Sequence, residues 1–455
     1  MIRSKRCWPE RIRAKTEFNG FVKIFLAQKL SYSPTWTGAA KSNRALLQCL
    51  SRRGHRCRVL ALAHTATHFA SRGGSFDESV NPANAGFSTS TERFDLQGVQ
   101  VHQLADTSQF CSQLLKRVGE FRPDWILISE DPSYLALAAA LESMPGRVVF
   151  LSHSQATLPF GPECFSPDPL KAQMLNRAAG IIAVSNYLQT YIRVWGGLHS
   201  VAIPLPAYGN PPFPYFGSLD NAFITMVNPS AIKGISIFLE LARALPAVRF
   251  AAVPTWATTA ADRVALKQFP NVQLLQPTED IDQIFARTRV LVMPSLWGEA
   301  FGKIVVEAML RGIPVLASNV GGLPEAKLGV DYLLPVYPIE RYETRRDEQL
   351  LPLPVVPDQD VMPWLDALKR LLSDRAHYER LSAESREAAM NYVSGLSITL
   401  FEEYLENLTP TLGVKLDGYG RESDRSSSAL NNLSKERLEL LTLLLRKSAP
   451  RDIKQ

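Results

Sequence analysis

Cysteine is scarce in this 455-residue chain, which has five. None of them forms a CxxC pair, and none has partner histidines at the spacing of a zinc site. A disulfide framework and the common zinc modules are therefore excluded. We expect reduced thiols in a cytoplasmic protein. The five residues are Cys7, Cys49, Cys57, Cys111 and Cys164.

Long hydrophobic runs are also absent. The best one, Tyr134–Leu141, stops at Glu142 and is far too short to cross a bilayer. The N-terminal MIRSKRCWPERIRAKTEF is basic but lacks the apolar core of a signal peptide. No transmembrane segment is therefore predicted. Residues 1–20 are expected to be a disordered leader, or to precede the true start codon.

The chain has no strong excess of charge of either sign. It contains 50 Lys and Arg against 44 Asp and Glu, a net charge of +6, and its basic residues are spread along the sequence. Without a basic block or a recognisable motif, a nucleic-acid partner is not expected. With 46% hydrophobic and 21% charged residues, the composition is that of a soluble globular protein. The length predicts two domains.

No metal site is predicted either. His64 and His68 stand four residues apart and would share a face of a helix. No third ligand lies nearby, and no glutamate follows in the HExxH manner. An acidic DxD-like pair placed to hold a divalent cation is also missing.

What the chain does contain is a strand–loop–helix–strand unit in residues 289–327. Two short buried-strand signals, Val290–Met293 and Pro314–Ala317, flank Phe301–Arg311, which has helical spacing. This order is typical of a parallel sheet, and such sheets bind ligands at the carboxyl ends of their strands. Glu299 lies in the loop and Glu307 in the early helix, where no core needs a carboxylate.

Strand and helix signals alternate along the rest of the chain, which predicts doubly wound α/β domains without a GxGxxG motif. The other predicted strands are Phe21–Ala27, Cys57–Ala63, Val99–Leu104, Trp125–Ser129, Val148–Leu151, Ile181–Val184, Phe223–Val227, Arg249–Val253 and Val272–Leu275. The other predicted helices are Arg44–Arg53, one ending near Val118, Tyr134–Leu141, Tyr187–Val194, Ile235–Leu245, Ile281–Arg287, Trp364–Leu372 and closing helices within Glu384–Asn407.

A domain boundary is predicted in Pro204–Phe216, which carries five prolines and has the composition of a linker. The expected parts are an N-terminal domain (21–204), a linker (205–220), a second domain (221–383), closing helices that pack back on the first domain (384–407), a flexible linker (408–432) and an amphipathic helix (433–447).

Several side chains follow predicted strands directly and should therefore meet at the sheet edges. His153 comes after Val148–Leu151, and Ser185 is suited to cap the helix that begins near Tyr187. Lys233 stands just before a helix, where its ammonium and free backbone N–H groups can share one anion. Gly38 follows the first strand's polar turn and allows a ligand to approach the backbone closely.

Taken together, these features resemble a known family. The set comprises Glu299-x7-Glu307 with Phe301-Gly302 inside it, Gly312-x-Pro314-Val315, and Gly321-Gly322-Leu323-Pro324-Glu325, with Lys233-Gly234 and the Gly38 loop in the expected order. The stretch from about Val22 to Asn407 is similar to family 4 of the retaining glycosyltransferases. The resemblance implies a GT-B fold, with two Rossmann-like doubly wound domains facing across a cleft, here followed by a tethered C-terminal helix.

The resemblance also implies roles for the donor-binding residues. In such enzymes Glu307 would bind the ribose diol of a nucleoside-diphosphate sugar, and Glu299 the hydroxyls of the transferred sugar. Backbone amides near Phe301 and Gly302 would assist the sugar and the distal phosphate, and Lys233 would balance the diphosphate. No metal or other cofactor is expected.

His153 matches the histidine at the cleft edge of the N-terminal domain in this family, where it would position the donor sugar and the acceptor. The favoured front-face mechanism lets the leaving phosphate take the acceptor's proton. A double displacement would instead need a carboxylate behind the anomeric carbon, for which Glu130 or Asp131 could be proposed.

The sequence departs from the family pattern in two places. Where the family usually has Gly-Arg, this chain has Val227-Asn228, so a phosphate there meets an amide without charge. Diphosphate binding is then expected to depend more on Lys233, or on another cation such as Lys303. The glycine pair of the first loop is Gly38-Ala39, which permits a less close approach.

Two segments beyond the catalytic unit leave the acceptor open. Residues 335–363 are a proline-rich, charged insertion, either a folded-back hairpin or acceptor-side loop or a passive surface insert. The leucine-rich helix predicted at 433–447 resembles linker helices of nonribosomal peptide and polyketide synthases, though it would also suit packing on its own domains.

The tail resemblance implies a tailoring enzyme for a peptide or polyketide product that docks to an assembly-line synthase. One alternative is transfer to a lipid or polysaccharide precursor at the inner membrane face, which the basic residues Arg44, Arg52 and Arg53 allow. Another is a nucleotide-sugar-binding scaffold.

Overall fold

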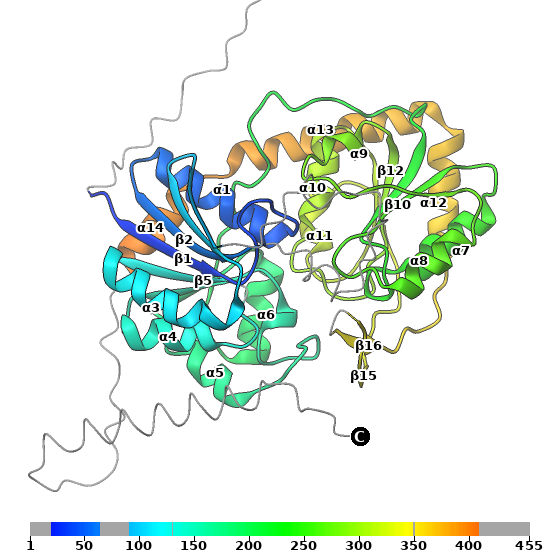
Figure 1. Cartoon of the computed structure of the whole chain (residues 1–455). Helices are drawn as coiled ribbons and strands as arrows, with labels where there is room; N and C mark the ends of the chain where they lie inside the picture. Colours follow the sequence, from blue (N-terminus) through cyan, green and yellow to red (C-terminus); the bar gives the residue numbers. More distant parts are fainter. Residues whose placement is uncertain (1–19, 64–90, 130, 349–350, 409–455) are drawn as a thin grey trace, which may run out of the picture. The chain divides into compact units, whose positions relative to one another are not determined.

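The computed structural model describes residues 20–63, 91–129, 131–348 and 351–408 (Figure 1). Several predictions lie outside these ranges: the leader, the histidine pair His64 and His68, Glu130, and the C-terminal helix at 433–447. Among the described residues, no helix is long and apolar enough to cross a membrane. The described cysteines are free thiols.

The N-terminal domain is built on an eight-stranded sheet of order β3-β4-β2-β1-β5-β6-β7-β8, parallel except for the β3–β4 pair. Its strands are β1 (Lys23–Gln28), β2 (Arg56–Leu62), β3 (Glu92–Leu96), β4 (Val99–Leu104), β5 (Trp125–Ser129), β6 (Val148–Ser152), β7 (Gly180–Ala183) and β8 (Val201–Ala202). Its helices are α1 (Gly38–Arg52), α3 (Phe110–Phe121), α4 (Leu135–Ser143), α5 (Pro169–Leu175) and α6 (Asn186–Gly196).

The second domain is built on a six-stranded parallel sheet of order β11-β10-β9-β12-β13-β14. Its strands are β9 (Phe223–Val227), β10 (Phe250–Val253), β11 (Val272–Leu274), β12 (Thr288–Met293), β13 (Val315–Ser318) and β14 (Leu333–Leu334). Its helices are α7 (Ile235–Ala244), α8 (Ala260–Lys267), α9 (Asp282–Phe285), α10 (Lys303–Leu310), α11 (Leu323–Ala326) and α12 (Met362–Ser373).

The central strands of both sheets are covered on two faces, which is why they read as continuous apolar runs. Every residue of β5 and of β6 is buried. One face of the first sheet packs against Leu114 and Leu137 of α3 and α4, and the other against Leu46 of α1. Such sheets bring the carboxyl ends of their strands to a common edge, where the predicted site residues gather.

The structure corrects the predicted start of the first helix. Helix α1 begins at Gly38, six residues before Arg44, because Thr37 caps it by accepting a hydrogen bond from the backbone N–H of Ala40. The turn after the first strand is therefore shorter than predicted, because it ends at Thr37.

The sequence did not predict three strands of the two sheets, β3, β8 and β14, or three α-helices, α5, α8 and α11. Strand β3 is an edge strand whose residues are all at least partly exposed, so it has no apolar run. Strand β8 has only two residues. Helices α5 and α8 are short, and each buries a single residue, Leu175 and Leu266.

The closing helices also differ from the prediction. Helix α13 (Arg375–Gly395) runs through the predicted boundary at 383–384. Its Ala389 packs in the core of the second domain, and Arg386 donates to the carbonyl oxygens of Phe213, Pro214 and Leu310. Only α14 (Thr399–Asn407) packs on the N-terminal domain.

Phe401 and Leu405 of α14 join the core of the N-terminal domain. Glu402 Oε1 of the same helix accepts a hydrogen bond from Arg53 Nε at 2.5 Å and lies 3.0 Å from His55 Nε2. The chain thus crosses to the second domain through the linker and returns through α13 and α14, so both domains are tied together twice (Figure 1).

The insertion forms the antiparallel hairpin β15 (Tyr342–Arg346) and β16 (Pro352–Pro354), which confirms the folded-back alternative. Arg346 Nη2 donates to the carbonyl oxygen of Phe165 in the N-terminal domain, at 3.3 Å.

Candidate active site

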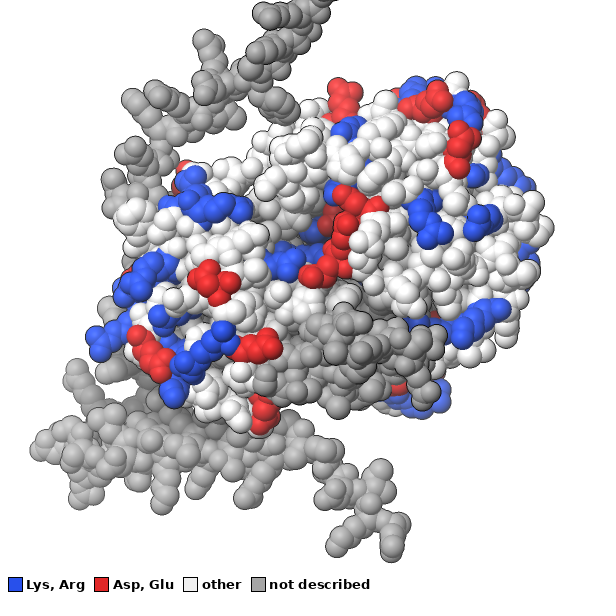
Figure 2. Space-filling view, turned by 45° about the horizontal axis from the view of Figure 1, so that its top comes forward, with Lys and Arg blue, Asp and Glu red and all other residues white. Residues whose placement is uncertain are grey.

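A cavity of about 680 Å³ lies at the carboxyl ends of both parallel sheets. Its lining includes the last residues of four strands: Leu62 of β2, Val227 of β9, Val253 of β10 and Met293 of β12. Figure 2 shows basic and acidic side chains together around a hollow near the middle of one face. All nine residues predicted for the site line this one cavity, namely Gly38, His153, Asn228, Lys233, Glu299, Phe301, Gly302, Lys303 and Glu307.

Glu299 is held by three donors of its own domain. Its Oε1 lies 2.5 Å from Lys233 Nζ, 2.5 Å from Ser295 Oγ and 3.1 Å from Trp297 Nε1. Glu299 is only 7% exposed and Lys233 8%, so their ion pair is largely withdrawn from water. Because all three contacts converge on Oε1, Oε2 is left to accept hydroxyl hydrogens from a ligand.

Lys233 also lies against two indole rings that line the cavity. Its Nζ is 4.7 Å from the ring centre of Trp297 and 5.8 Å from that of Trp256. Phe165 of the N-terminal domain stacks on Trp297 with ring centres 6.1 Å apart, and Trp256 lies 6.3 Å from Trp297. We call Phe165, Trp256 and Trp297 the tryptophan cluster; it forms an apolar wall beside Glu299.

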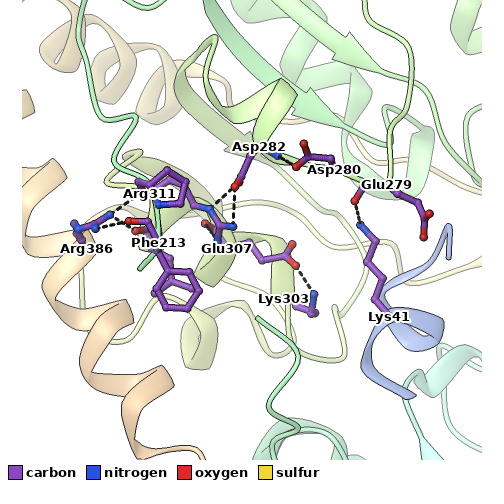
Figure 3. Close-up of polar contacts among 11 residues, drawn as sticks. Lys41, Phe213, Glu279, Asp280, Asp282, Lys303, Glu307, Arg311 and Arg386 are labelled. Atoms are coloured by element: carbon purple, nitrogen blue, oxygen red, sulfur yellow. Dashed lines mark hydrogen bonds and ion pairs between the residues drawn. The ribbon is translucent and has the colours of Figure 1, made fainter. Parts of the chain in front are cut away.

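Glu307 forms an ion pair with Lys303, one turn earlier on α10 (Figure 3). Gly302 precedes the helix with φ of 96°, a conformation that glycine adopts most readily. The contact uses Oε1 of Glu307, which again leaves one carboxylate oxygen for a ligand. Lys303 Nζ lies 5.4 Å from the ring centre of Tyr208, a residue of the interdomain linker.

A second aromatic group adjoins this pair. Phe301 stacks on Tyr392 of α13 with ring centres 5.9 Å apart, and Tyr208 meets Tyr392 edge-on at 6.2 Å. All three line the cavity. The linker and α13 therefore contribute to the site, although no motif or local pattern predicted their involvement.

Lys41 of α1 reaches the same region from the N-terminal domain (Figure 3). Its Nζ donates to the backbone oxygen of Glu279 at 3.3 Å, and no described carboxylate lies within ion-pair distance of it. Burial lowers the pKa of Lys41, while the negative charge of Glu307 opposes that shift. Lys41 stands one helical turn after Gly38, which is the only sequence signal that could have found it.

The Glu279 carboxylate ties the two domains together beside Lys41. Its Oε1 accepts from the backbone N–H and the hydroxyl of Thr35, at 2.7 and 2.8 Å, and from Arg44 Nη1 at 3.1 Å. Burial alone would raise the pKa of Glu279, but the hydrogen bonds from Thr35 and the charge of Arg44 hold it below its ordinary value.

His153 is half-buried at the end of β6, and its Nε2 lies 2.8 Å from Asn43 Oδ1. The Asn43 amide donates to Gln28 Oε1 and Ser129 Oγ, so its oxygen is the acceptor and His153 carries its proton on Nε2. Burial lowers the pKa of His153 to about 4. The imidazole is therefore neutral, with the lone pair of Nδ1 left to accept a hydrogen bond.

Asn228 and the Gly38-Ala39 pair occupy the places in which the sequence departs from the family pattern. Asn228 Oδ1 accepts from the backbone N–H of Ala257 at 3.0 Å, so only its amide hydrogens remain for an anion. Apart from its chain neighbours and the backbone of α1, no described atom lies within 4 Å of the position that a Cβ on Gly38 would take, which leaves room for a ligand beside it.

The structure excludes Asp131 as a nucleophile. Asp131 is 1% exposed, and its carboxylate accepts from the backbone N–H groups of Ala136 and Leu137 and pairs with Lys29 at 3.0 Å. It caps α4 and is not among the residues that line the cavity. Within the described ranges, no group of three or more His, Cys, Asp or Glu side chains is placed to hold a metal ion.

Two protein-family models match the chain. "Glycosyltransferase Family 4" matches residues 36–204, and "Glycosyl transferases group 1" matches residues 222–374. The first covers most of the N-terminal domain, and the second covers the second domain as far as the end of α12.

Among curated proteins, the chain is 25% identical over 140 residues to an exopolysaccharide phosphotransferase of Streptomyces coelicolor, covering 30% of this chain and 13% of that protein. It is 30% identical over 117 residues to a D-inositol 3-phosphate glycosyltransferase of Corynebacterium diphtheriae, covering 26% and 22%. It is 33% identical over 93 residues to an uncharacterized protein in the cps region of Klebsiella pneumoniae, covering 20% and 25%. The chain thus spans a quarter or less of these relatives.

Solved structures share the fold along most of the chain. A sucrose-phosphate synthase of Thermosynechococcus elongatus superposes with a TM-score of 0.62 at 16% identity, covering 85% of this chain and 98% of that one. HepE of Anabaena, in complex with UDP-glucose, gives 0.57 at 18% identity, with the same coverage. The chain therefore has the GT-B fold, and the two family matches in sequence order support its assignment as a GT-B glycosyltransferase of group 1.

Proposed function

We propose that this protein is a retaining glycosyltransferase that moves a sugar from a nucleoside-diphosphate sugar to an acceptor hydroxyl without a divalent metal. One observation carries the proposal: Glu299, Glu307 and Lys233 converge on a single cavity between the carboxyl ends of two parallel sheets. Each carboxylate keeps one oxygen for ligand hydroxyls, and the site offers several ammonium groups to a diphosphate.

Glu307 binds the ribose of the donor in this proposal, and Glu299 binds hydroxyls of the transferred sugar. Lys233 offsets the charge that grows on the diphosphate as the glycosidic bond breaks. The helix start at Gly302 and Lys303 adds backbone N–H groups that face anions favourably.

Lys41 takes the place of the cation that Asn228 does not supply. Lys303 is already paired with Glu307, and Lys233 with Glu299, whereas Lys41 is held only by a backbone oxygen. An ammonium without a carboxylate partner in a half-buried position is attracted strongly by an entering diphosphate. Because Lys41 belongs to the N-terminal domain, it offers the donor a charge from across the cavity.

The chemical step exchanges substituents on one face of the anomeric carbon. The bond from that carbon to the diphosphate oxygen breaks, the bond to the acceptor oxygen forms, and the acceptor's proton goes to the leaving diphosphate. His153 does not serve as the base, because burial lowers its pKa to about 4 and makes it a weak proton acceptor; the lone pair of its Nδ1 can still orient a hydroxyl. Its place beside the cavity makes it a positioning group for donor sugar and acceptor.

The rate of transfer should therefore show no acid limb near the usual histidine pKa. Burial lowers the pKa of His153 to about 4, so the imidazole stays neutral throughout the range from pH 5 to 8. Replacing His153 with alanine should lower kcat/KM about 10–100-fold at every pH in this range. The exposed His199 provides the matched control, since His199→Ala should leave the profile unchanged. A limb centred near pH 6.5 that disappears in His153→Ala would contradict this assignment.

For the acceptor we propose a peptide or polyketide natural product. The tryptophan cluster and Leu351 of the hairpin loop give the cavity an apolar wall that suits an aglycone. The docking helix at 433–447, by which the enzyme would reach a synthase, remains a prediction from the sequence.

A second candidate acceptor is a polysaccharide or lipid precursor, favoured by relatives from a cps region and from exopolysaccharide metabolism. Peripheral attachment to a membrane has weaker support than the sequence suggested. Arg44 is paired with Glu279 and Arg53 with Glu402, which leaves Arg52 of the three basic residues without an ion pair among the described residues.

A thermal-shift screen with nucleoside diphosphates and their sugars tests the donor proposal directly. One nucleotide series should raise Tm by several degrees at saturating concentration, because a ligand that binds only the folded state stabilises it. Slow hydrolysis of the sugar nucleotide in the same series would distinguish an enzyme from a binding scaffold. If no nucleotide shifts Tm, the proposed function is wrong.

A further inference from the structure

The backbone segment that carries Glu299 is held largely by the other domain. The carbonyl oxygen of Gly298 accepts from Gln155 Nε2, and its N–H donates to Glu163 Oε1 at 2.9 Å. The carbonyl oxygen of Ala300 accepts from Ser185 Oγ. Within its own domain, the segment accepts one backbone hydrogen bond: the N–H of Gly322 donates to the carbonyl oxygen of Glu299 at 2.6 Å.

The three side chains from the N-terminal domain are themselves well supported. Gln155 is fully buried and begins a one-turn helix two residues after His153. Ser185 is 1% exposed and caps α6, accepting from the N–H of Leu188 while its own hydroxyl donates to Ala300. Tyr187 Oη lies 3.4 Å from the second oxygen of Glu163, and burial raises the pKa of that carboxyl.

Gly298 shows how closely the domains approach at this point. A Cβ there would lie 2.3 Å from Tyr187 Oη and 2.6 and 2.7 Å from the two oxygens of Glu163. Its φ is not in the left-handed region, so alanine suits the local backbone. A side chain at position 298 would therefore displace the Tyr187 hydroxyl and the Glu163 carboxylate, the two groups of the N-terminal domain that pack against this peptide.

The carboxylate of Glu299 is therefore fixed within the second domain, whereas both domains hold the backbone segment that carries it. Lys233, Ser295 and Trp297 hold the carboxylate from within the second domain. The N-terminal domain holds the flanking residues Gly298 and Ala300, while Gly322 of the second domain holds the carbonyl oxygen of Glu299 itself. Any opening of the domains would release Gly298 and Ala300 together.

We propose that Gln155, Glu163 and Ser185 are positioning residues which set Glu299 for transfer only when the two domains are in contact. The proposal rests on the proposed function for the role of Glu299, but not for the contact itself. It makes sugar transfer, rather than nucleotide binding, depend on domain closure. A misplaced catalytic group can cost about 100-fold in rate even when binding is retained.

The contact can be tested on the full chain without a ligand, by hydrogen–deuterium exchange of peptides that cover 294–303. Glu163→Leu and Gly298→Ala should speed exchange in this segment about tenfold, since one interdomain hydrogen bond is lost or blocked. Glu163→Gln keeps an accepting oxygen and should restore most of the protection. Gly119→Ala is the matched control, because Gly119 lies in α3 with no atom within 4 Å of a Cβ. Equal exchange in the wild type and all four variants would overturn the contact.

The kinetic arm uses the sugar nucleotide identified by the thermal-shift screen. Gly298→Ala and Glu163→Leu should lower kcat about 100-fold, while the Kd for the nucleoside diphosphate stays within about threefold. Glu163→Gln should recover most of the lost rate. Loss of nucleotide affinity in step with kcat would overturn the positioning role. If the wild type turns over no sugar nucleotide, the proposed function fails, whereas the exchange result still decides whether the contact exists.

Discussion

Replacing Lys233 with methionine should lower the rate of sugar transfer about 10²–10³-fold, the cost of removing a charge that stabilises the leaving group. Glu299→Gln should have a comparable effect. The two side chains form a buried pair 2.5 Å apart, so they act as one unit. The double variant should then be little slower than either single variant, as is common for catalytic groups that depend on each other.

The same pair allows a test on stability that does not require a substrate. Each single variant leaves one ion without its partner in a site that is about 10% exposed, which should cost about 3 kcal/mol of unfolding free energy. In Lys233→Met, the Glu299 carboxylate keeps hydrogen bonds from Ser295 and Trp297. This variant should therefore lose less unfolding free energy than Glu299→Gln. The double variant should be more stable than the sum of the single losses implies.

The measurement is a double-mutant cycle. Urea denaturation and kcat are measured on the same samples of the wild type, the two single variants and the double variant. Variants of the exposed pair Arg243 and Glu240 are the matched control, since a surface ion pair contributes little. If the losses of kcat and of unfolding free energy in the double variant equal the sums of the losses in the two single variants, Lys233 and Glu299 act separately.

The second domain could be predicted well because its site lies in one continuous stretch. Glu299, Gly302 and Glu307 are close in sequence, and all three lie in or next to the turn between β12 and α10, which lines the cavity. The central strands were also predictable, since burial on both faces leaves long apolar runs.

What could not be predicted depends on contacts between distant parts of the chain. Lys41, Tyr208 and Tyr392 line the cavity from the first helix, the linker and α13. Their only local signal is the place of Lys41, one helical turn after Gly38. Gln155 and Glu163 matter only because the domains meet at Gly298. Local patterns cannot report such a meeting, because it depends on how two separately folded sheets are placed.

The errors in element boundaries have local causes. Gly38 and Ala39 were read as part of a loop, although Thr37 caps a helix that starts there. Strand β3 pairs only through β4 and exposes most of its side chains, so its sequence ERFDL lacks an apolar run. Helix α13 continues past 384 because Ala389 and Arg386 belong to the packing of the second domain.

Replacing Glu307 with alanine should abolish the thermal shift given by the best nucleotide, which corresponds to a loss of at least about 100-fold in affinity. A carboxylate that accepts two hydroxyl hydrogens contributes charge-assisted hydrogen bonds, each of about 1.5–3 kcal/mol. Lys303→Met should have a much smaller effect, because it removes the partner of Glu307 and frees the carboxylate for the ribose. Isothermal titration with the nucleoside diphosphate measures both.

Combining the variant Glu307→Gln with a 2′-deoxy ligand in one thermodynamic cycle shows whether Glu307 binds the ribose. The wild type should prefer the nucleoside diphosphate over its 2′-deoxy analogue by about tenfold, the value of one such hydrogen bond. Glu307→Gln has an amide that still accepts from one hydroxyl but carries no charge, so the preference should shrink to about twofold. If the preference is unchanged in Glu307→Gln, the carboxylate binds another part of the donor. The ribose would then have to be held by other residues that line the cavity.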